Sequence, residues 1–177
     1  MSYSLPRGDE LYHERLRFRL IDFLLALEAL PALGFLAMFF YQVYIGPIGN
    51  EPAPNFIYLL MFLLFLGVVW LLANMRYLDI SLTPEALTVA FGRFRKSVPW
   101  RNVAAVEKMR GPTWIYGYGF HLGLTRGGWV LVYNILGHSA LSLELSGGRI
   151  RRLVFSTAHP EEVMALVEGK IKRNDSI

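Results

Sequence analysis

Residue types that carry out chemistry are few and scattered in this chain of 177 residues. The four histidines (His13, His121, His138 and His159) lack the spacing of a metal motif such as HExxH. The chain has no cysteine, which excludes disulfides, Cys-ligated zinc or iron–sulfur sites and thiol catalysis. It also lacks a phosphate loop, a dinucleotide fingerprint and a nucleophile elbow. The sequence therefore predicts no catalytic, cofactor-binding or metal site, and we expect neither enzyme activity nor a small-molecule substrate.

Two single residues have a chemical interpretation of their own. Glu28 stands inside an apolar stretch, where an ionised carboxylate costs about 2–3 kcal/mol even on lenient insertion scales. A proton-linked role or a polar contact with a partner subunit would explain it. We favour the plainer interpretation that Glu28 lies near the membrane interface, snorkels or is protonated. His121 is better explained as a hydrogen-bonded structural histidine than as a ligand, because one histidine without partner groups makes no site.

Basic side chains form two clusters in the second half of the chain. The first comprises Arg93, Arg95, Lys96 and Arg101, and the second comprises Arg149, Arg151 and Arg152. We interpret both as solvated surface or as simple attraction to anionic lipid, worth about 1 kcal/mol per residue near a membrane. A specific head-group site is the alternative. The net charge of +4 is too modest and too dispersed to indicate nucleic-acid binding.

Two apolar blocks account for the high apolar content of 54% and the mean hydropathy of +0.35. Residues 56–75 contain no charged residue and span roughly 30 Å as a helix, which is about the hydrocarbon thickness of a bilayer. Residues 20–46 are interrupted early by Asp22, Glu28 and Pro31 and are uncharged afterwards. This block is too long for a signal peptide, and its acidic residues are out of place in one. The sequence predicts two transmembrane helices.

The charges that flank these blocks predict their orientation. The connecting loop, residues 47–55, is rich in turn residues and holds Glu51 but no Lys or Arg. Four arginines precede the first block, Arg7, Arg15, Arg17 and Arg19, and Arg76 follows the second. By the positive-inside rule, the helices form a multi-pass hairpin in the inner cell membrane with both termini cytoplasmic. The predicted organisation is a cytoplasmic segment 1–19, a transmembrane hairpin 20–76 and a cytoplasmic domain 77–177.

From residue 77 onward the hydrophobic period changes from 3.6 to 2, as in half-buried strands. Turn signals such as Gly92-Arg93 separate about seven predicted antiparallel strands. Residues 111–125 alternate large apolar residues with glycines, and their aromatic members Trp114, Tyr116 and Tyr118 are candidates for contact with a partner. A terminal helix is predicted to begin at Pro160, followed by two acidic residues that suit a helix N-terminus.

This order of elements resembles the bacterial pleckstrin-homology-like domain of small prokaryotic membrane proteins. The segment ISLTPEALTVAFGRFRKSVPWRNVAAVE (residues 80–107) resembles its opening hairpin, and YGYGF (residues 116–120) its glycine-aromatic segment. ALSLELSGGRIRRLVFSTAHPEEVMALV (residues 140–167) is similar to its final hairpin and helix entry. The resemblance covers residues 77–173. It implies two nearly orthogonal antiparallel sheets capped by a helix, with no catalytic residues.

These observations favour a non-enzymatic, membrane-anchored module whose β domain contacts a protein partner or its own copies. A module that responds to anionic lipid through the basic clusters is the alternative, and the lipid bilayer is a partner in either case. A transporter fragment or enzyme centred on Glu28 is the weakest hypothesis, because two spans are too few for a transport pathway unless they oligomerise.

Overall fold

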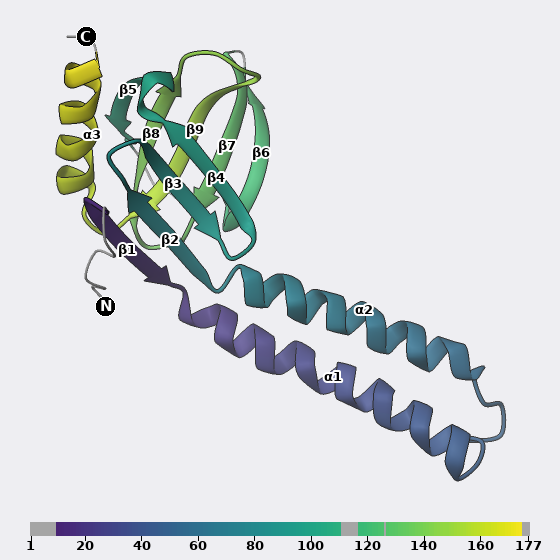
Figure 1. The fold of residues 1–177 in the computed structure, drawn as a ribbon. Coiled ribbons are helices and arrows are strands. Elements are labelled where there is room, and N and C mark those ends of the chain that lie inside the picture. Colours follow the sequence, from purple (N-terminus) through teal and green to yellow (C-terminus); the bar gives the residue numbers. More distant parts are fainter. Residues whose placement is uncertain (1–9, 111–116, 126, 175–177) are drawn as a thin grey trace. The chain divides into compact units, whose positions relative to one another are not determined.

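The computed structural model describes residues 10–110, 117–125 and 127–174. The chain forms two compact units (Figure 1). One is a helical hairpin, Arg19–Arg76, and the other is a mainly-β domain that combines Met1–Phe18 with Tyr77–Ile177. The hairpin is thus inserted into the sequence of the β domain.

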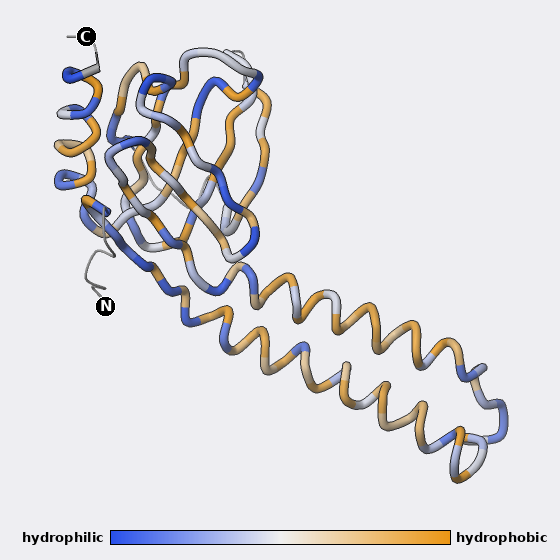
Figure 2. The backbone as a smooth tube through the Cα atoms, viewed as in Figure 1, coloured by the Kyte–Doolittle hydropathy of each residue, from blue (hydrophilic) through white to orange (hydrophobic). Residues whose placement is uncertain are grey.

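The hairpin consists of helices α1 (Arg19–Tyr44) and α2 (Asn55–Asn74). Their bounds agree to within two residues with the two apolar blocks of the sequence. Figure 2 shows apolar residues along most of both helices and polar residues at the loop that joins them. Both helices are long and apolar enough to cross a membrane.

Contacts between the two helices hold the hairpin together along its length. Phe35 stacks on Phe65 with ring centroids 5.6 Å apart. Near the connecting loop, the Gln42 side-chain amide donates hydrogen bonds to the Ala53 carbonyl, at 2.7 Å, and to the Asn55 side chain, at 2.5 Å. At the other end, Arg76 Nε lies 2.5 Å from Asp22 Oδ1, so the acidic residue in the first turn of α1 is ion-paired.

Sheet A of the β domain has the strand order β1-β2-β3-β4 and is antiparallel throughout. Its strands are β1 (Tyr12–Arg17), β2 (Tyr77–Leu82), β3 (Ala86–Phe91) and β4 (Phe94–Pro99). The sequence analysis placed β1 in a separate N-terminal segment and missed it as a strand. Yet β1 pairs with β2 over its full length, from Tyr12 opposite Leu82 to Arg17 opposite Tyr77. The strands on either side of the hairpin in sequence are therefore neighbours in one sheet.

A buried carboxylate explains why β1 was hard to predict. Glu14 occupies an inward position between Tyr12 and Leu16 and is only 7% exposed. Its Oε2 accepts hydrogen bonds from the Tyr12 hydroxyl (2.9 Å) and the Thr157 hydroxyl (2.6 Å), and its Oε1 accepts one from the Ala158 N–H (2.8 Å). Burial and the nearby Glu14 charge raise the pKa of Tyr12, so its phenol stays protonated and donates. Glu14 thereby joins β1 to the segment that enters the last helix.

Sheet B contains five strands in the order β5-β8-β9-β7-β6. They are β5 (Val103–Lys108), β6 (Gly119–Thr125), β7 (Gly128–Asn134), β8 (Ser139–Leu145) and β9 (Ile150–Thr157). A short 3-10 helix, η1 (Trp100–Asn102), leads into β5. The central strand β9 pairs antiparallel with β8 but parallel with β7, so the expectation of a purely antiparallel arrangement is wrong at this pair. The run of buried residues from Leu153 to Thr157 suits a central strand covered on both faces.

The core lies between the two sheets. Phe91 of sheet A stacks on Tyr133 of sheet B with centroids 6.0 Å apart, and both side chains are almost fully buried. Helix α3 (Pro160–Asn174) packs against β5, η1 and β8, and it buries Val163 and Val167. The predicted start of this helix at Pro160 is confirmed.

The described strands differ from the predicted set in number and in one boundary. Nine strands replace the expected seven or so, with β1 as the missed one. The strand predicted over residues 111–125 begins at Gly119 in the described part of the chain. Trp114 and Tyr116 lie outside the described residues.

We expect Glu14→Ala to lower the free energy of unfolding of the β domain by about 2–4 kcal/mol. The substitution leaves two buried hydroxyls and one backbone N–H without their acceptor. Urea unfolding of the full chain in detergent, followed by tryptophan fluorescence, measures the change. The control is Glu107→Ala, which removes an exposed carboxylate and should shift stability by less than about 0.5 kcal/mol. Equal effects of the two substitutions would show that the Glu14 contacts do not hold β1 in place.

Candidate functional site

The two ends of sheet A differ in their connections. At one end Arg17 pairs with Tyr77, and the chain continues from these residues into α1 and back from α2. The register of β2 on β3 and of β3 on β4 places the turn residue Arg93 at the same end. We call this the hairpin-linked end of the domain. The opposite end, which includes Val98, is called the distal end.

Cationic side chains gather on the outer face of sheet A towards the hairpin-linked end. Arg15 donates two hydrogen bonds to the Asp79 carboxylate, at 2.5 and 3.1 Å, and these bonds raise the pKa of Arg15. The Arg15 and Arg17 guanidinium carbons lie 5.4 and 5.9 Å from the Tyr77 ring centroid, within cation–π range. Arg95 is on the same outer face, because its cross-strand partner Ala90 is paired in turn with Asp79.

The structure does not keep the first predicted basic cluster together. Arg93 and Arg95 lie towards the hairpin-linked end and are exposed. Lys96 is the cross-strand partner of the fully buried Val89 and so faces the side of sheet A that packs on sheet B. Arg101, in η1, follows Pro99 at the distal end and is exposed.

The second predicted basic cluster is divided as well. Arg149 lies in the exposed turn between β8 and β9. Arg152 is ion-paired with Glu144 of β8, with Nη2 and Oε1 3.0 Å apart. Arg151 is exposed and packs so closely on Gly128 that a Cβ at Gly128 would lie 2.7 Å from its Cγ. One member of each cluster, Lys96 and Arg149, lines the same cavity.

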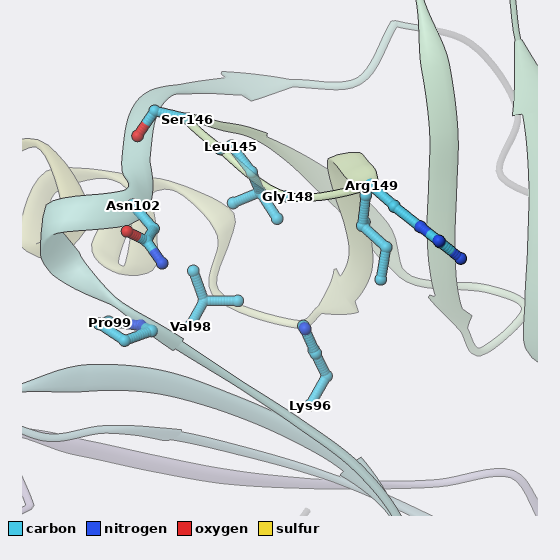
Figure 3. A pocket seen from close by; sticks show the side chains of 10 residues that line it. Lys96, Val98, Pro99, Asn102, Leu145, Ser146, Gly148 and Arg149 are labelled. Atoms are coloured by element: carbon cyan, nitrogen blue, oxygen red, sulfur yellow. The ribbon is translucent and has the colours of Figure 1, made fainter.

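This cavity opens between the edge of sheet A and the β8–β9 turn, at the distal end, and has a volume of about 440 Å³. Figure 3 shows Lys96 and Val98 pointing from β4 towards Leu145 and the turn, with Arg149 on the far side of the opening. Its lining combines apolar side chains, the glycines of the turn and two cationic groups. The lining residues are Lys96, Val98, Pro99, Asn102, Leu145, Ser146, Gly147, Gly148, Arg149 and Ile150.

Tyr118 is the one member of the predicted aromatic run that lies within the described residues. It is half-buried rather than exposed, and it stacks on Phe18 with ring centroids 4.8 Å apart. Its ring also lies 6.1 Å from that of Phe91, which belongs to the core. Tyr118 therefore packs within the domain, next to the residue that precedes α1.

An exposed apolar surface lies instead on the β6–β7 hairpin. Leu122 and Leu124 are 51% and 70% exposed, and Trp129, the cross-strand partner of Leu124, is 40% exposed. Further along the same face, Leu131 and Tyr133 are almost fully buried under sheet A. The core-facing side of this hairpin thus extends beyond the cover of sheet A towards the distal end. We call Leu122, Leu124 and Trp129 the distal apolar surface.

His121 and Glu28 were singled out in the sequence, and neither belongs to a cluster of metal-ligating side chains among the described residues. His121 is half-buried on the opposite face of β6, and burial lowers its pKa, so it is neutral at pH 7. Glu28 lies within α1 and is partly exposed. In the described part of the chain, no group of three or more His, Asp or Glu side chains could hold a metal ion.

Comparisons with protein-family models, with curated proteins and with solved structures found no match for this chain.

Sequence reasoning missed the distal apolar surface. Its signal is present, because Leu122, Leu124 and Trp129 continue the alternation of large apolar residues on both sides of a glycine turn. Alternation shows that these side chains share one face of the hairpin, and it does not show where the opposing sheet ends. The sequence also predicted two separate basic clusters, whereas the strand pairing divides the members of each cluster between different ends and faces of the sheets.

Proposed function

We propose that this protein is a membrane-anchored, non-enzymatic interaction module, whose pleckstrin-homology-like β domain contacts a protein partner at the cytoplasmic face of the cell membrane. The observation that carries the proposal is the distal apolar surface. Three large apolar side chains on one face of a rigid hairpin are exposed together, and clustered exposure of this kind marks interaction sites more often than single exposed residues do.

The anchoring rests on α1 and α2, which have the length and composition of membrane spans. The flanking charges support the orientation. Arg17 and Arg19 precede or begin α1 and Arg76 follows α2, while the loop between the helices contains Glu51 and no Lys or Arg. By the positive-inside rule, these charges support a cytoplasmic location of the β domain.

The connections to the hairpin argue against a recruitment role. One residue separates β1 from α1, and two residues separate α2 from β2. Tethers of this length reach about 7 Å at most, so the domain cannot leave a bilayer that its hairpin spans. A soluble lipid-binding module functions by moving from the cytoplasm to a membrane. A chain that is permanently anchored by its hairpin would have no such step.

The two antiparallel-rich sheets and the closing helix α3 support the pleckstrin-homology-like assignment. Domains of this architecture serve as scaffolds for binding surfaces, and the fold alone does not set the function.

A lipid-responsive function is a second candidate, and one observation favours it. Arg93 lies in the β3–β4 turn, at the same end of sheet A as Arg17 and Tyr77, which lead into and out of the hairpin in sequence. Arg17 lies at the same end, and Arg95 is one pair further along. A cationic side chain within reach of anionic lipid gains about 1 kcal/mol, so these residues would orient the domain on a bilayer that they contact.

The membrane assignment predicts that the full chain stays in the pellet after alkaline extraction and ultracentrifugation of membranes. A protease-cleavable tag at the C-terminus should resist external protease in intact cells and become accessible after lysis. A tag inserted in the loop beside Glu51 is the matched comparison and should be cleaved in intact cells. Recovery of untreated protein in the supernatant would contradict the anchoring.

Substitution of the distal apolar surface tests the partner-binding role. We expect Leu124→Ser with Trp129→Ser to lower the amount of crosslinked or co-purified partner at least about tenfold, because the substitutions remove the two apolar side chains that pair across the hairpin tip. Quantitative mass spectrometry after purification in gentle detergent measures the amount of partner that is retained. Leu11→Ser is the control. Leu11 is also exposed, at 45%, but it adjoins sheet A, where its N–H donates to the Leu82 carbonyl. A wild-type chain that purifies only as a monomer without partner would refute the role.

Charge reversal at the hairpin-linked end tests the lipid-responsive candidate. We expect Arg93→Glu with Arg95→Glu to reduce the number of anionic lipids retained in native mass spectra of the full chain by about two. The control Arg151→Glu with Arg149→Glu changes the same charge but lies at the distal end of sheet B and should leave retention near the wild-type value. Identical retention in all three proteins would dismiss a lipid-responsive function.

A further inference from the structure

Strand β4 is an edge of sheet A, since β3 is its only strand neighbour among the described residues. The two-residue turn after Phe91 makes Phe91 and Phe94 a hydrogen-bonded pair, and hydrogen-bonded pairs then alternate along the ladder. Arg95 and Ser97 fall at the other parity, so their backbone N–H and C=O groups point away from β3. Pro99 has the same parity and lacks an N–H, which agrees with this alternation.

The cavity beside this edge has a net positive lining. Lys96 and Arg149 are its two charged lining residues, and no acidic residue lines it. In the described part of the chain neither of these side chains takes part in an ion pair. In Figure 3, Lys96 extends from β4 towards the β8–β9 turn, and Arg149 extends outward from that turn at the rim of the cavity. An anionic group between them would be favoured by both charges.

A small inorganic anion would neither fill this cavity nor contact its apolar walls. Val98, Leu145 and Ile150 give the cavity apolar walls, and its volume of about 440 Å³ far exceeds the share of one water molecule, about 30 Å³. An occupant that fits both features has a carboxylate and apolar groups on one chain. Extended peptides meet this condition, because their alternate side chains point to the same side.

The positive charges on and beside β4 also argue against a second copy of this chain as the added strand. If β4 of a second copy paired with this edge, Arg95 and Lys96 would approach their own copies, and like charges on paired strands are destabilising. The cavity lies at the distal end of the domain, away from the residues that lead into the hairpin. The apolar walls of Val98, Leu145 and Ile150 favour a protein segment with apolar side chains over a polar lipid head group.

We propose that β4 binds an extended acidic segment of a partner protein as an added strand, with one of its carboxylates between Lys96 and Arg149. The backbone of the segment pairs with Arg95 and Ser97, and its apolar side chains contact Val98 and Ile150. This inference rests on the proposed partner-binding function and names the chemistry of the partner.

The test uses the full chain in nanodiscs of neutral lipid and fluorescent eight-residue peptides of defined sequence. An alternating Val-Glu peptide should bind with an anisotropy change that weakens as salt is raised, since screening reduces the charge contribution. An alternating Val-Lys peptide should bind at least about a hundredfold more weakly, because both cavity charges then repel it. Equal binding of the two peptides, or no binding of the Val-Glu peptide, overturns the proposal.

Charge reversal locates the carboxylate. Lys96→Glu and Arg149→Glu should each weaken binding of the Val-Glu peptide at least about tenfold. Arg151→Glu is the matched control, since it reverses an exposed charge outside the cavity lining and should change affinity less than about threefold. If all three substitutions weaken binding equally, the attraction is a general charge effect and the site is wrong.

Strand addition is tested at Ser97. Ser97→Pro removes the outward N–H and the hydroxyl that contacts Thr88, whereas Ser97→Ala removes only the hydroxyl. We expect Ser97→Pro alone to weaken peptide binding about tenfold, and amide hydrogen exchange at Arg95 and Ser97 in the wild-type chain to slow when the peptide is added. Circular dichroism checks that both variants fold. If Ser97→Pro folds and binds like Ser97→Ala, the peptide does not pair with β4.

These results separate the inference from the proposed function. If the distal apolar surface is needed for partner capture while the Lys96 and Arg149 variants capture partner normally, the function stands and the β4 site is wrong. If those two variants alter anionic-lipid retention and leave peptide binding unchanged, the cavity is a lipid site and the inference is overturned.

Discussion

The β domain depends on the pairing of β1 with β2, because these two strands lie on either side of the helical hairpin in sequence. The ladder runs from Tyr12 opposite Leu82 to Arg17 opposite Tyr77, and Arg15 adds a two-point hydrogen bond to Asp79 across it. Glu14 fastens the same strand to Thr157 and Ala158, just before α3 begins. An edge strand held by backbone pairing alone would fray easily, whereas a buried carboxylate with three donors holds it from its inner side. Strand β1 therefore connects β2 of sheet A with the end of β9 in sheet B, just before α3 begins.

This closure gives the domain two ends with different properties. The hairpin-linked end collects the cation–π contacts of Arg15 and Arg17 with Tyr77 and the stack of Phe18 on Tyr118. The distal end has the exposed Leu124 and Trp129 and the cavity beside β4. Burial explains the difference, since the core face of β6 and β7 is covered by sheet A near Tyr133 and uncovered near the β6–β7 turn.

The edge strand β4 illustrates how one residue can serve two purposes. A charged side chain that points inward from an edge strand opposes pairing with an identical edge, which protects a sheet from self-aggregation. Lys96 has this position, and the same charge favours an acidic strand over a basic one. Lys96 therefore serves both purposes: it opposes pairing of β4 with an identical strand, and it favours the acidic segment that we infer as the partner.

The sequence by itself determined the hairpin, most strands and the start of α3, because these depend on local signals. The length of the two mainly apolar blocks predicted α1 and α2 to within two residues, and proline followed by two acidic residues predicted the start of α3 at Pro160. It could not identify β1, where Glu14 sits at an inward position and three arginines or histidines fill the outward ones. Local patterns treat a carboxylate as a surface residue, and only the donors of Tyr12, Thr157 and Ala158, which fold against it from distant segments, make its burial favourable. The tertiary structure likewise decided that Lys96 and Arg149 share a cavity and that Leu124 is exposed, since the register between strands and the extent of the opposing sheet are properties of long-range pairing.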